Sequence, residues 1–192
     1  HFMYEAYYQL QAKPFQLSPD PSFFFSSRGH RRALAYLEYG VHQGEGFIVI
    51  TGEIGAGKTL LASTLARKMT SRSLVLAQVV STSLDADDVV RMVAAAFGLS
   101  QENSKAELLN RIEQFLLACH RQGKRVLLLV DEAQNLPARA LEELRMLSNF
   151  VSAGKPLLQT FLLGQPEFRK TLQSPEMEQL RQRVTATCHL GP

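Results

Sequence analysis

The chain has 192 residues, of which 45% are hydrophobic and 20% are charged, and its formal net charge is +3. This length supports one well-buried core and is short for two typical domains, while the composition excludes disordered and fibrous proteins. No apolar run approaches the roughly 18 residues of a membrane span, and no secretory signal is evident, so we expect a soluble chain. The 21 basic residues are spread along the sequence, and charge alone does not indicate nucleic-acid binding. Cys119 and Cys188 lack zinc-ligand spacing and are expected to be buried, reduced thiols.

The beginning of the chain differs in character from the rest. Two residues precede Met3, and we expect residues 1–2 to be a remnant of cloning. Residues 3–46 are expected to form an N-terminal leader and a helix. The leader, residues 4–27, is rich in proline and aromatic residues, which excludes a continuous helix and favours an extended segment over the domain. A helix is then predicted from a cap at Ser27 to about His42.

From residue 47 onward, short apolar runs alternate with amphipathic helical patterns. Strands are predicted at Phe47–Thr51, Leu74–Val80, Val126–Val130, Leu157–Leu163 and Val184–Leu190. Helices are predicted over 57–69, Asp85–Phe97, Ser104–Gln122 and Ala138–Ala153, with two short helical pieces after Pro166 and Pro175. This alternation predicts an α/β fold with a parallel sheet covered on both faces. A ligand site is expected at the carboxyl ends of the strands.

A glycine-rich loop is predicted between the first strand and the helix that follows it. Residues 52–59 read Gly-Glu-Ile-Gly-Ala-Gly-Lys-Thr and match the Walker A pattern at every fixed position. Glycines let the backbone wrap closely so that amides point at phosphate oxygens, and the helix N-terminus adds partial positive charge. Lys58 is expected to reach the β- and γ-phosphates and Thr59 to bind Mg²⁺, so ATP and Mg²⁺ are the predicted cofactors. The residues expected to contact the nucleotide are Glu53, Ile54, Gly55, Ala56, Gly57, Lys58, Thr59 and Leu60.

Two carboxylates follow the strand predicted at Val126–Val130, at Asp131 and Glu132. One predicted strand and two predicted helices separate them from Lys58, which is the layout of P-loop ATPases that use an additional glutamate. There the neighbouring strand end brings the acids beside the phosphate loop. We expect Asp131 to hold Mg²⁺ beside Thr59, mainly through a water, and Glu132 to orient and deprotonate the attacking water. An acidic turn at a strand end is the alternative, which the phosphate loop disfavours.

Further short motifs accompany these two along the chain. They are Met3-Tyr4-Glu5, Pro14-Phe15, Pro19-Asp20-Pro21, His30, Ala33-Leu34, Asp131-Glu132-Ala133-Gln134-Asn135-Leu136, Gly164-Gln165-Pro166-Glu167 and Leu180-Arg181-Gln182-Arg183-Val184. With them, residues 3–192 resemble the AAA+ ATPases of the general secretion pathway protein A (ExeA-like) family, which includes exosortase- and exopolysaccharide-associated ATPases. The resemblance implies a three-layer αβα sandwich with a five-stranded parallel sheet in the order 5-1-4-3-2. Residues 47–192 would be the AAA+ nucleotide-binding core, without the C-terminal lid that relatives carry.

The resemblance also implies roles for residues outside the two main motifs. The leader would pack on the adenine side of the nucleotide. Gln165, at the tip of the fourth strand, would be a sensor residue that touches the γ-phosphate or the water. Arg183, with Arg181 as the alternative, would be an arginine finger for a neighbouring subunit, since it ends the helix before the fifth strand. A solvated helix end is the other interpretation of both arginines.

At the level of function, the resemblance implies an ATPase core that assembles or energises an envelope export system, for type II secretion or exopolysaccharide export. It implies a cytoplasmic protein, or one at the inner membrane when full length. Its partners would be other copies of the chain and envelope secretion components, and nucleic acid is not expected. A transposition or DNA-associated helper ATPase is an alternative, because related AAA+ proteins share the core motifs. A small-molecule kinase is disfavoured because Glu132 suits activation of water, and a nucleotide-gated adaptor with little turnover stays open.

Overall fold

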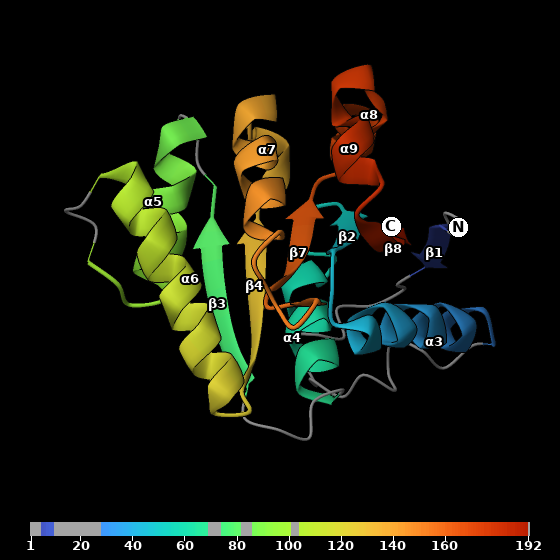
Figure 1. The fold of residues 1–192 in the computed structure, drawn as a ribbon. Helices are drawn as coiled ribbons and strands as arrows, with labels where there is room; N and C mark the ends of the chain where they lie inside the picture. The colour runs from blue at the N-terminus through green and yellow to red at the C-terminus, as the bar shows by residue number, and fades with distance from the viewer. Residues whose placement is uncertain (1–4, 10–27, 69–73, 82–85, 101–103, 192) are drawn as a thin grey trace.

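The computed structural model describes residues 5–9, 28–68, 74–81, 86–100 and 104–191. Its described residues form a parallel sheet of six strands in the order β1-β8-β2-β7-β4-β3 (Figure 1). The strands are β1 (Glu5–Gln9), β2 (Phe47–Gly52), β3 (Leu74–Val80), β4 (Arg125–Asp131), β7 (Gln159–Gly164) and β8 (Val184–Gly191). From β8 to β3 the sheet has the predicted five-strand order 5-1-4-3-2, which is therefore confirmed.

The sixth strand, β1, comes from the N-terminal leader and lies at the edge of the sheet beside β8. Its backbone runs parallel to β8, with Glu5 opposite Thr187 and Gln9 opposite Gly191. The sequence pattern did not predict this strand, because five residues next to a proline-rich stretch give no alternation from which a strand can be recognised. The rest of the leader, residues 10–27, lies outside the described residues, and so does its expected packing on the adenine side.

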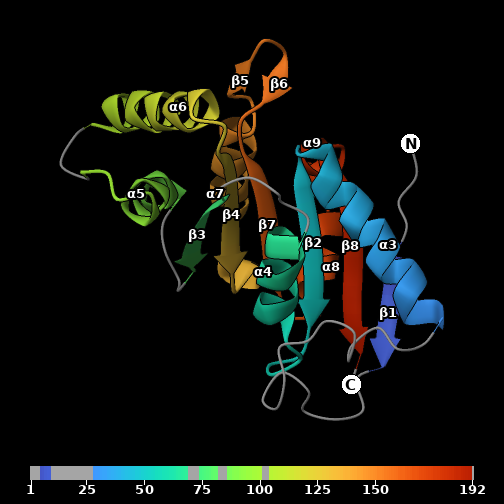
Figure 2. The same cartoon turned by 90° about the horizontal axis from the view of Figure 1, so that it is seen from below.

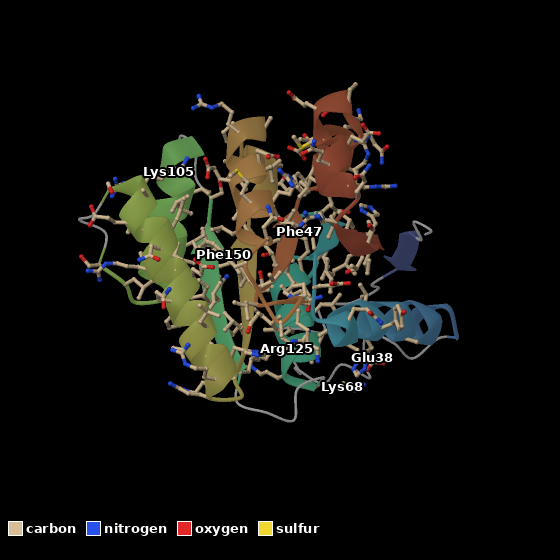
Figure 3. The ribbon with its side chains drawn as sticks, in the orientation of Figure 1. Glu38, Phe47, Lys68, Lys105, Arg125 and Phe150 are labelled. Carbon is tan, nitrogen blue, oxygen red and sulfur yellow. The ribbon has the colours of Figure 1, made fainter. Side chains whose placement is uncertain are left out.

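The helices cover both faces of the sheet (Figure 2). They are α3 (Arg28–Gln43), α4 (Lys58–Lys68), α5 (Ala86–Ala96), α6 (Lys105–Arg121), α7 (Ala138–Leu147), α8 (Phe168–Gln173) and α9 (Glu178–Arg181), with single 3₁₀ turns η1 (Ala133–Asn135) and η2 (Pro175–Met177). Helices α3 and α4 share one face, where Lys68 Nζ lies 3.0 Å from Glu38 Oε2 (Figure 3). Among the described helices, none combines the length and apolar character needed to cross a membrane.

The central strands are buried on both sides, as expected for a parallel sheet between helical layers. Along β4, Leu127 and Leu129 pack into a cluster with α3 and α4, whereas Leu128 and Val130 pack into a second cluster with α5 to α9. Strands β2 and β7 are buried at every residue. The three-layer architecture therefore follows from strands that are apolar on both faces.

The helix predicted over Ala138–Ala153 is wrong after Leu147. Helix α7 ends at Leu147, and a two-stranded hairpin follows, with β5 (Val151–Ser152) antiparallel to β6 (Lys155–Pro156). Its turn is Ala153-Gly154, and both residues have positive φ angles, 52° and 79°. This is the backbone of a tight two-residue hairpin turn, and a helix cannot contain it. The hairpin extends beyond the amino ends of the strands (Figure 2).

A buried polar contact fixes the amino edge of the sheet. Gln159, which is 1% exposed, donates from Nε2 to the carbonyl oxygens of Gly40 at 2.9 Å and Glu45 at 3.0 Å. Its Oε1 accepts a 2.6 Å hydrogen bond from Arg125 Nη2, which also donates to the Val41 carbonyl. The end of α3 is thereby attached to β4 and β7, at the sheet edge opposite the phosphate loop.

Candidate nucleotide-binding site

The predicted phosphate loop connects β2 to α4 at the carboxyl edge of the sheet. Gly55 and Gly57 have φ angles of 83° and 90°, in the left-handed region that a Cβ disfavours. Gly52 ends β2 against β8, where an added Cβ would lie 3.1 Å from both Cβ and O of Leu190. The glycines of the motif are thus required by the backbone path, and the loop delivers the first turn of α4 to this edge.

Lys58 is the first residue of α4, and only 8% of it is exposed. Its ammonium donates to two carbonyl oxygens of its own loop, Gly52 at 2.7 Å and Glu53 at 3.1 Å. Burial lowers the pKa of Lys58, while the carboxylates of Asp131, Glu132 and Glu53 oppose that shift. A largely buried cation with neutral carbonyl partners would gain from an anionic ligand, which is the property that a phosphate site needs.

Thr59 and Asp131 meet beside this lysine. Thr59 Oγ1 donates a 3.1 Å hydrogen bond to Asp131 Oδ2, although the two residues are far apart in the sequence. Asp131 ends β4 and Thr59 lies in the first turn of α4. A hydroxyl and a carboxylate are oxygen ligands of the kind that Mg²⁺ prefers, so the pair fits the metal that the sequence predicts.

Glu132 occupies a constrained turn directly after the strand. Its backbone is left-handed, with φ 55° and ψ 42°, and its amide donates to Asp131 Oδ1 at 2.8 Å. A left-handed conformation in a residue other than glycine costs roughly 1–3 kcal/mol and persists only where surrounding contacts enforce it. The turn therefore fixes the direction in which the Glu132 side chain leaves the backbone.

Gln134, in η1, is a contact residue that the sequence interpretation did not assign to the site. Its Nε2 donates to Glu132 Oε1 at 3.3 Å, and its Oε1 accepts from the backbone amide of Gln165 at 2.9 Å. Gln165 follows β7 and thus lies at the carboxyl edge, as predicted. The only sequence signal for Gln134 was its position in the Asp-Glu-Ala-Gln stretch, which does not reveal its partners.

Two further polar residues lie near the acids. Ser81 follows β3, donates from its amide to the Asp131 carbonyl at 3.0 Å, and accepts from Asn135 Nδ2 at 3.3 Å on its own carbonyl. Its hydroxyl is buried, and the structure gives it no hydrogen-bond partner among the described residues. The backbone contacts hold the turn that carries Glu132 against the end of β3.

On the other side of the loop, His189 of β8 contacts β2. Its Nδ1 lies 2.9 Å from the hydroxyl of Thr51, which is fully buried. Burial lowers the pKa of His189, the charges of Arg169 and Lys58 lower it further, and Glu53 opposes them. A histidine with this depressed pKa is mainly neutral at pH 7, so it adds little positive charge beside the loop.

The two arginines predicted as finger candidates do not join this group. Arg183 lies immediately before β8, where its carbonyl accepts from the amide of Phe47 at 2.8 Å, at the amino edge of the sheet. Its guanidinium donates to Ser148 Oγ at 2.7 Å and Asn149 Oδ1 at 2.8 Å. Arg181 donates to the carbonyls that end α8, each at 2.6 Å. Neither arginine reaches the phosphate loop of its own chain.

A parallel sheet in this order, with a Walker A loop between β2 and α4, defines the class of P-loop nucleotide-binding proteins. Within that class the chain belongs to the AAA domain family, which matches residues 41–172. It is 38% identical over 192 residues to general secretion pathway protein A of Aeromonas hydrophila, covering 99% of this chain and 35% of that protein. This identity confirms the resemblance inferred from the sequence motifs. The chain spans about a third of the length of this curated relative.

Solved structures show the same fold at low sequence identity. The Aeropyrum pernix ORC2 protein, in its ADPNP-ADP complexes, matches with a TM-score of 0.64 and 17% identity, over 85% of this chain and 47% of that one. The Cdc6p protein of Pyrobaculum aerophilum matches with a TM-score of 0.56 and 14% identity, over 89% of this chain and 48% of that one. These matches show that the chain has the α/β P-loop AAA fold.

Proposed function

We propose that this chain binds ATP with Mg²⁺ at the phosphate loop and hydrolyses it. The observation that carries the proposal is the contact between Thr59 and Asp131, since it brings a hydroxyl and a carboxylate from separate elements together beside Lys58. Glu132 follows in a turn of fixed backbone direction. A purely structural acidic turn would not require a Walker A threonine within hydrogen-bond distance.

In the bound state, Lys58 would exchange its two loop carbonyls for the β- and γ-phosphates. Thr59 Oγ1 and the Asp131 carboxylate would hold Mg²⁺, the carboxylate mainly through a water. The metal supplies positive charge that neutralises the phosphate oxygens. The remaining loop residues from Glu53 to Leu60 would surround the phosphates with backbone amides.

Hydrolysis would depend on Glu132. Its carboxylate takes a proton from water as the water oxygen bonds to the γ-phosphorus, while the bond from that phosphorus to the bridging oxygen of ADP breaks. The products are ADP and phosphate, and the proton passes from Glu132 to solvent. Gln165 would contact the γ-phosphate or the water from the end of β7. Arg183 would act on the nucleotide of an adjacent copy, consistent with its place at the opposite edge of its own sheet.

The test is a comparison of the parent with Glu132→Gln, with Glu176→Gln as a control at an exposed glutamate. Calorimetry should give the same ATP affinity for all three proteins. Phosphate release under single-turnover conditions, with protein in excess, should be roughly 10²–10⁴-fold slower for Glu132→Gln alone. A parent that binds no ATP, or equal turnover by parent and Glu132→Gln, would contradict the proposal.

For the wider role, we propose that the ATPase assembles or energises a bacterial envelope export system, as part of an oligomer with envelope components. The support is the 38% identity to general secretion pathway protein A across this chain. In the source organism, a chromosomal Glu132→Gln change should reduce export to the level of a gene deletion. Normal export together with ATP-dependent, salt-sensitive retention of DNA would instead favour the DNA-associated helper.

A further inference from the structure

The side chain of Gln134 lies between the proposed base and the neighbouring strand. One end donates to Glu132 Oε1 at 3.3 Å, and the other end accepts from the Gln165 amide at 2.9 Å. These bonds use one donor and one acceptor of the same amide group, so the orientation of that group is determined. The Glu132 carboxylate is thereby connected, through one side chain, to the end of β7.

The surrounding backbone is shaped to permit this bridge. The last residue of β7 is Gly164, and a Cβ there would lie 3.2 Å from Gln134 Oε1 and 3.0 Å from Phe168 Cβ. A side chain at this position would therefore crowd both the glutamine and Phe168. The left-handed turn at Glu132 fixes where its side chain begins, and the Gln134 amide limits where the carboxylate ends.

We propose that Gln134 is a positioning residue that holds Glu132 for proton abstraction and links it to the end of β7. The inference rests on the hydrolysis proposed above. One carboxylate oxygen is restrained by the amide, which leaves the other oxygen to take the proton. A carboxylate free to rotate would spend less time in the geometry needed for attack, and small misplacements of a reacting group cost up to about 10²-fold in rate.

Two substitutions of Gln134 test the contributions of its two hydrogen bonds. Gln134→Glu keeps an oxygen that accepts from the Gln165 amide but replaces the donor to Glu132 with a second carboxylate. Gln134→Met keeps the length of the side chain and removes both bonds. Gln114→Leu, at an exposed glutamine of α6, is the matched control. Single-turnover phosphate release, ATP affinity and thermal unfolding should be measured for each.

We expect the single-turnover rate of phosphate release to fall roughly 10- to 100-fold in Gln134→Glu and Gln134→Met, with ATP affinity within about threefold of the parent. Gln114→Leu should match the parent. In the Glu132→Gln background, adding Gln134→Met should slow hydrolysis no further, because the glutamine acts through Glu132. A parent-level rate of single-turnover phosphate release in Gln134→Glu would overturn the inference while leaving the hydrolysis proposal intact.

Three other outcomes would also overturn the positioning role of Gln134. Parallel loss of ATP affinity and turnover in both Gln134 variants would indicate a structural support of the loop and would overturn the positioning role. An additional loss in the double variant would do the same. A parent that binds ATP but releases no phosphate in single turnover would overturn the proposed hydrolysis, and the role of Gln134 with it.

Discussion

The hydroxyl of Thr59 donates to the carboxylate of Asp131 at 3.1 Å, across a separation of 72 residues in the sequence. In the sheet, β7 lies between the strand before Thr59 and the strand that ends at Asp131. The contact therefore spans the intervening strand position at the carboxyl edge. The Thr59–Asp131 contact can form only if this strand order and the assignment of both motifs are correct, so it supports all of them.

Removing the threonine hydroxyl should weaken the metal-dependent part of ATP binding. Thr59→Val keeps the shape of the side chain and deletes the oxygen that donates to Asp131. ATP affinity in the presence of Mg²⁺ should fall roughly 10- to 100-fold, with little change in its absence, as expected for the loss of one contact to a charged group. Titrations with and without Mg²⁺ measure this. Thr64→Val in the same helix is the control, and an unchanged effect of Mg²⁺ in Thr59→Val would contradict the assignment.

Lys58 should make ATP affinity decrease at alkaline pH. When no nucleotide is bound, burial holds the pKa of Lys58 below the ordinary lysine value of 10.5. Bound phosphates favour the charged ammonium, so the lysine takes up a proton on binding once the pH exceeds that lowered pKa. ATP affinity should therefore fall as the pH rises through the alkaline range.

Calorimetry in buffers of different ionisation enthalpy reports this proton uptake directly. Lys58→Arg keeps a permanent positive charge and should lose the dependence, whatever its affinity. Lys58→Ala should abolish measurable binding. If the arginine variant and the parent share one alkaline profile, another group is responsible.

The buried contact at Gln159 should matter for stability and leave nucleotide binding largely unchanged. Gln159→Leu would leave the Gly40 and Glu45 carbonyls and the Arg125 guanidinium without their buried partner. An unsatisfied buried group of this kind costs about 1–3 kcal/mol, and Arg125 keeps its bond to the Val41 carbonyl. The two carbonyls alone therefore predict a loss of roughly 2–6 kcal/mol in the free energy of unfolding. Urea denaturation provides the measurement. Gln173→Leu, at an exposed position, should stay within about 0.5 kcal/mol of the parent.

Arg183→Ala should affect turnover only where copies of the chain associate. The guanidinium is held by Ser148 and Asn149 at the amino edge of its own sheet, so a catalytic role requires a second copy. Turnover per chain in the parent should rise with protein concentration, and the variant should lack that rise. Arg183→Lys tests whether charge alone suffices, and it should behave like alanine because it lacks the planar fork. An equal loss of turnover at high dilution would disprove the role in trans.

The parts of the site that the sequence predicted are those in which chemistry prescribes residue types at fixed local spacing. A phosphate loop needs glycines, a lysine and a hydroxyl within eight residues, and an apolar run that ends in two acids indicates a buried strand and its exposed end. Gln134 and Ser81 could not be assigned in this way. Their partners, the Gln165 amide and the Asp131 carbonyl, belong to other strands, so their role exists only once the sheet has formed.

The errors in the fold have similar causes. Helix α7 was predicted to continue through residue 153 because its apolar spacing runs on and the first glycine lies at Gly154. A positive φ at Ala153 cannot be foreseen from the residue type, since alanine favours helices. Strand β1 was missed because its stability comes from pairing with β8 at the far end of the chain.

That pairing has a consequence for any molecule that approaches the sheet from this side. Residues 5–9 satisfy the backbone donors and acceptors along one margin of β8, from Thr187 to Gly191. If they were withdrawn, β8 would present that row unsatisfied, and an extended peptide of matching direction could take their place. The N-terminal strand thus covers an edge of the sheet at which strand exchange could otherwise occur, and it does so with Tyr7 directly opposite His189, whose side chain contacts Thr51 just before the phosphate loop.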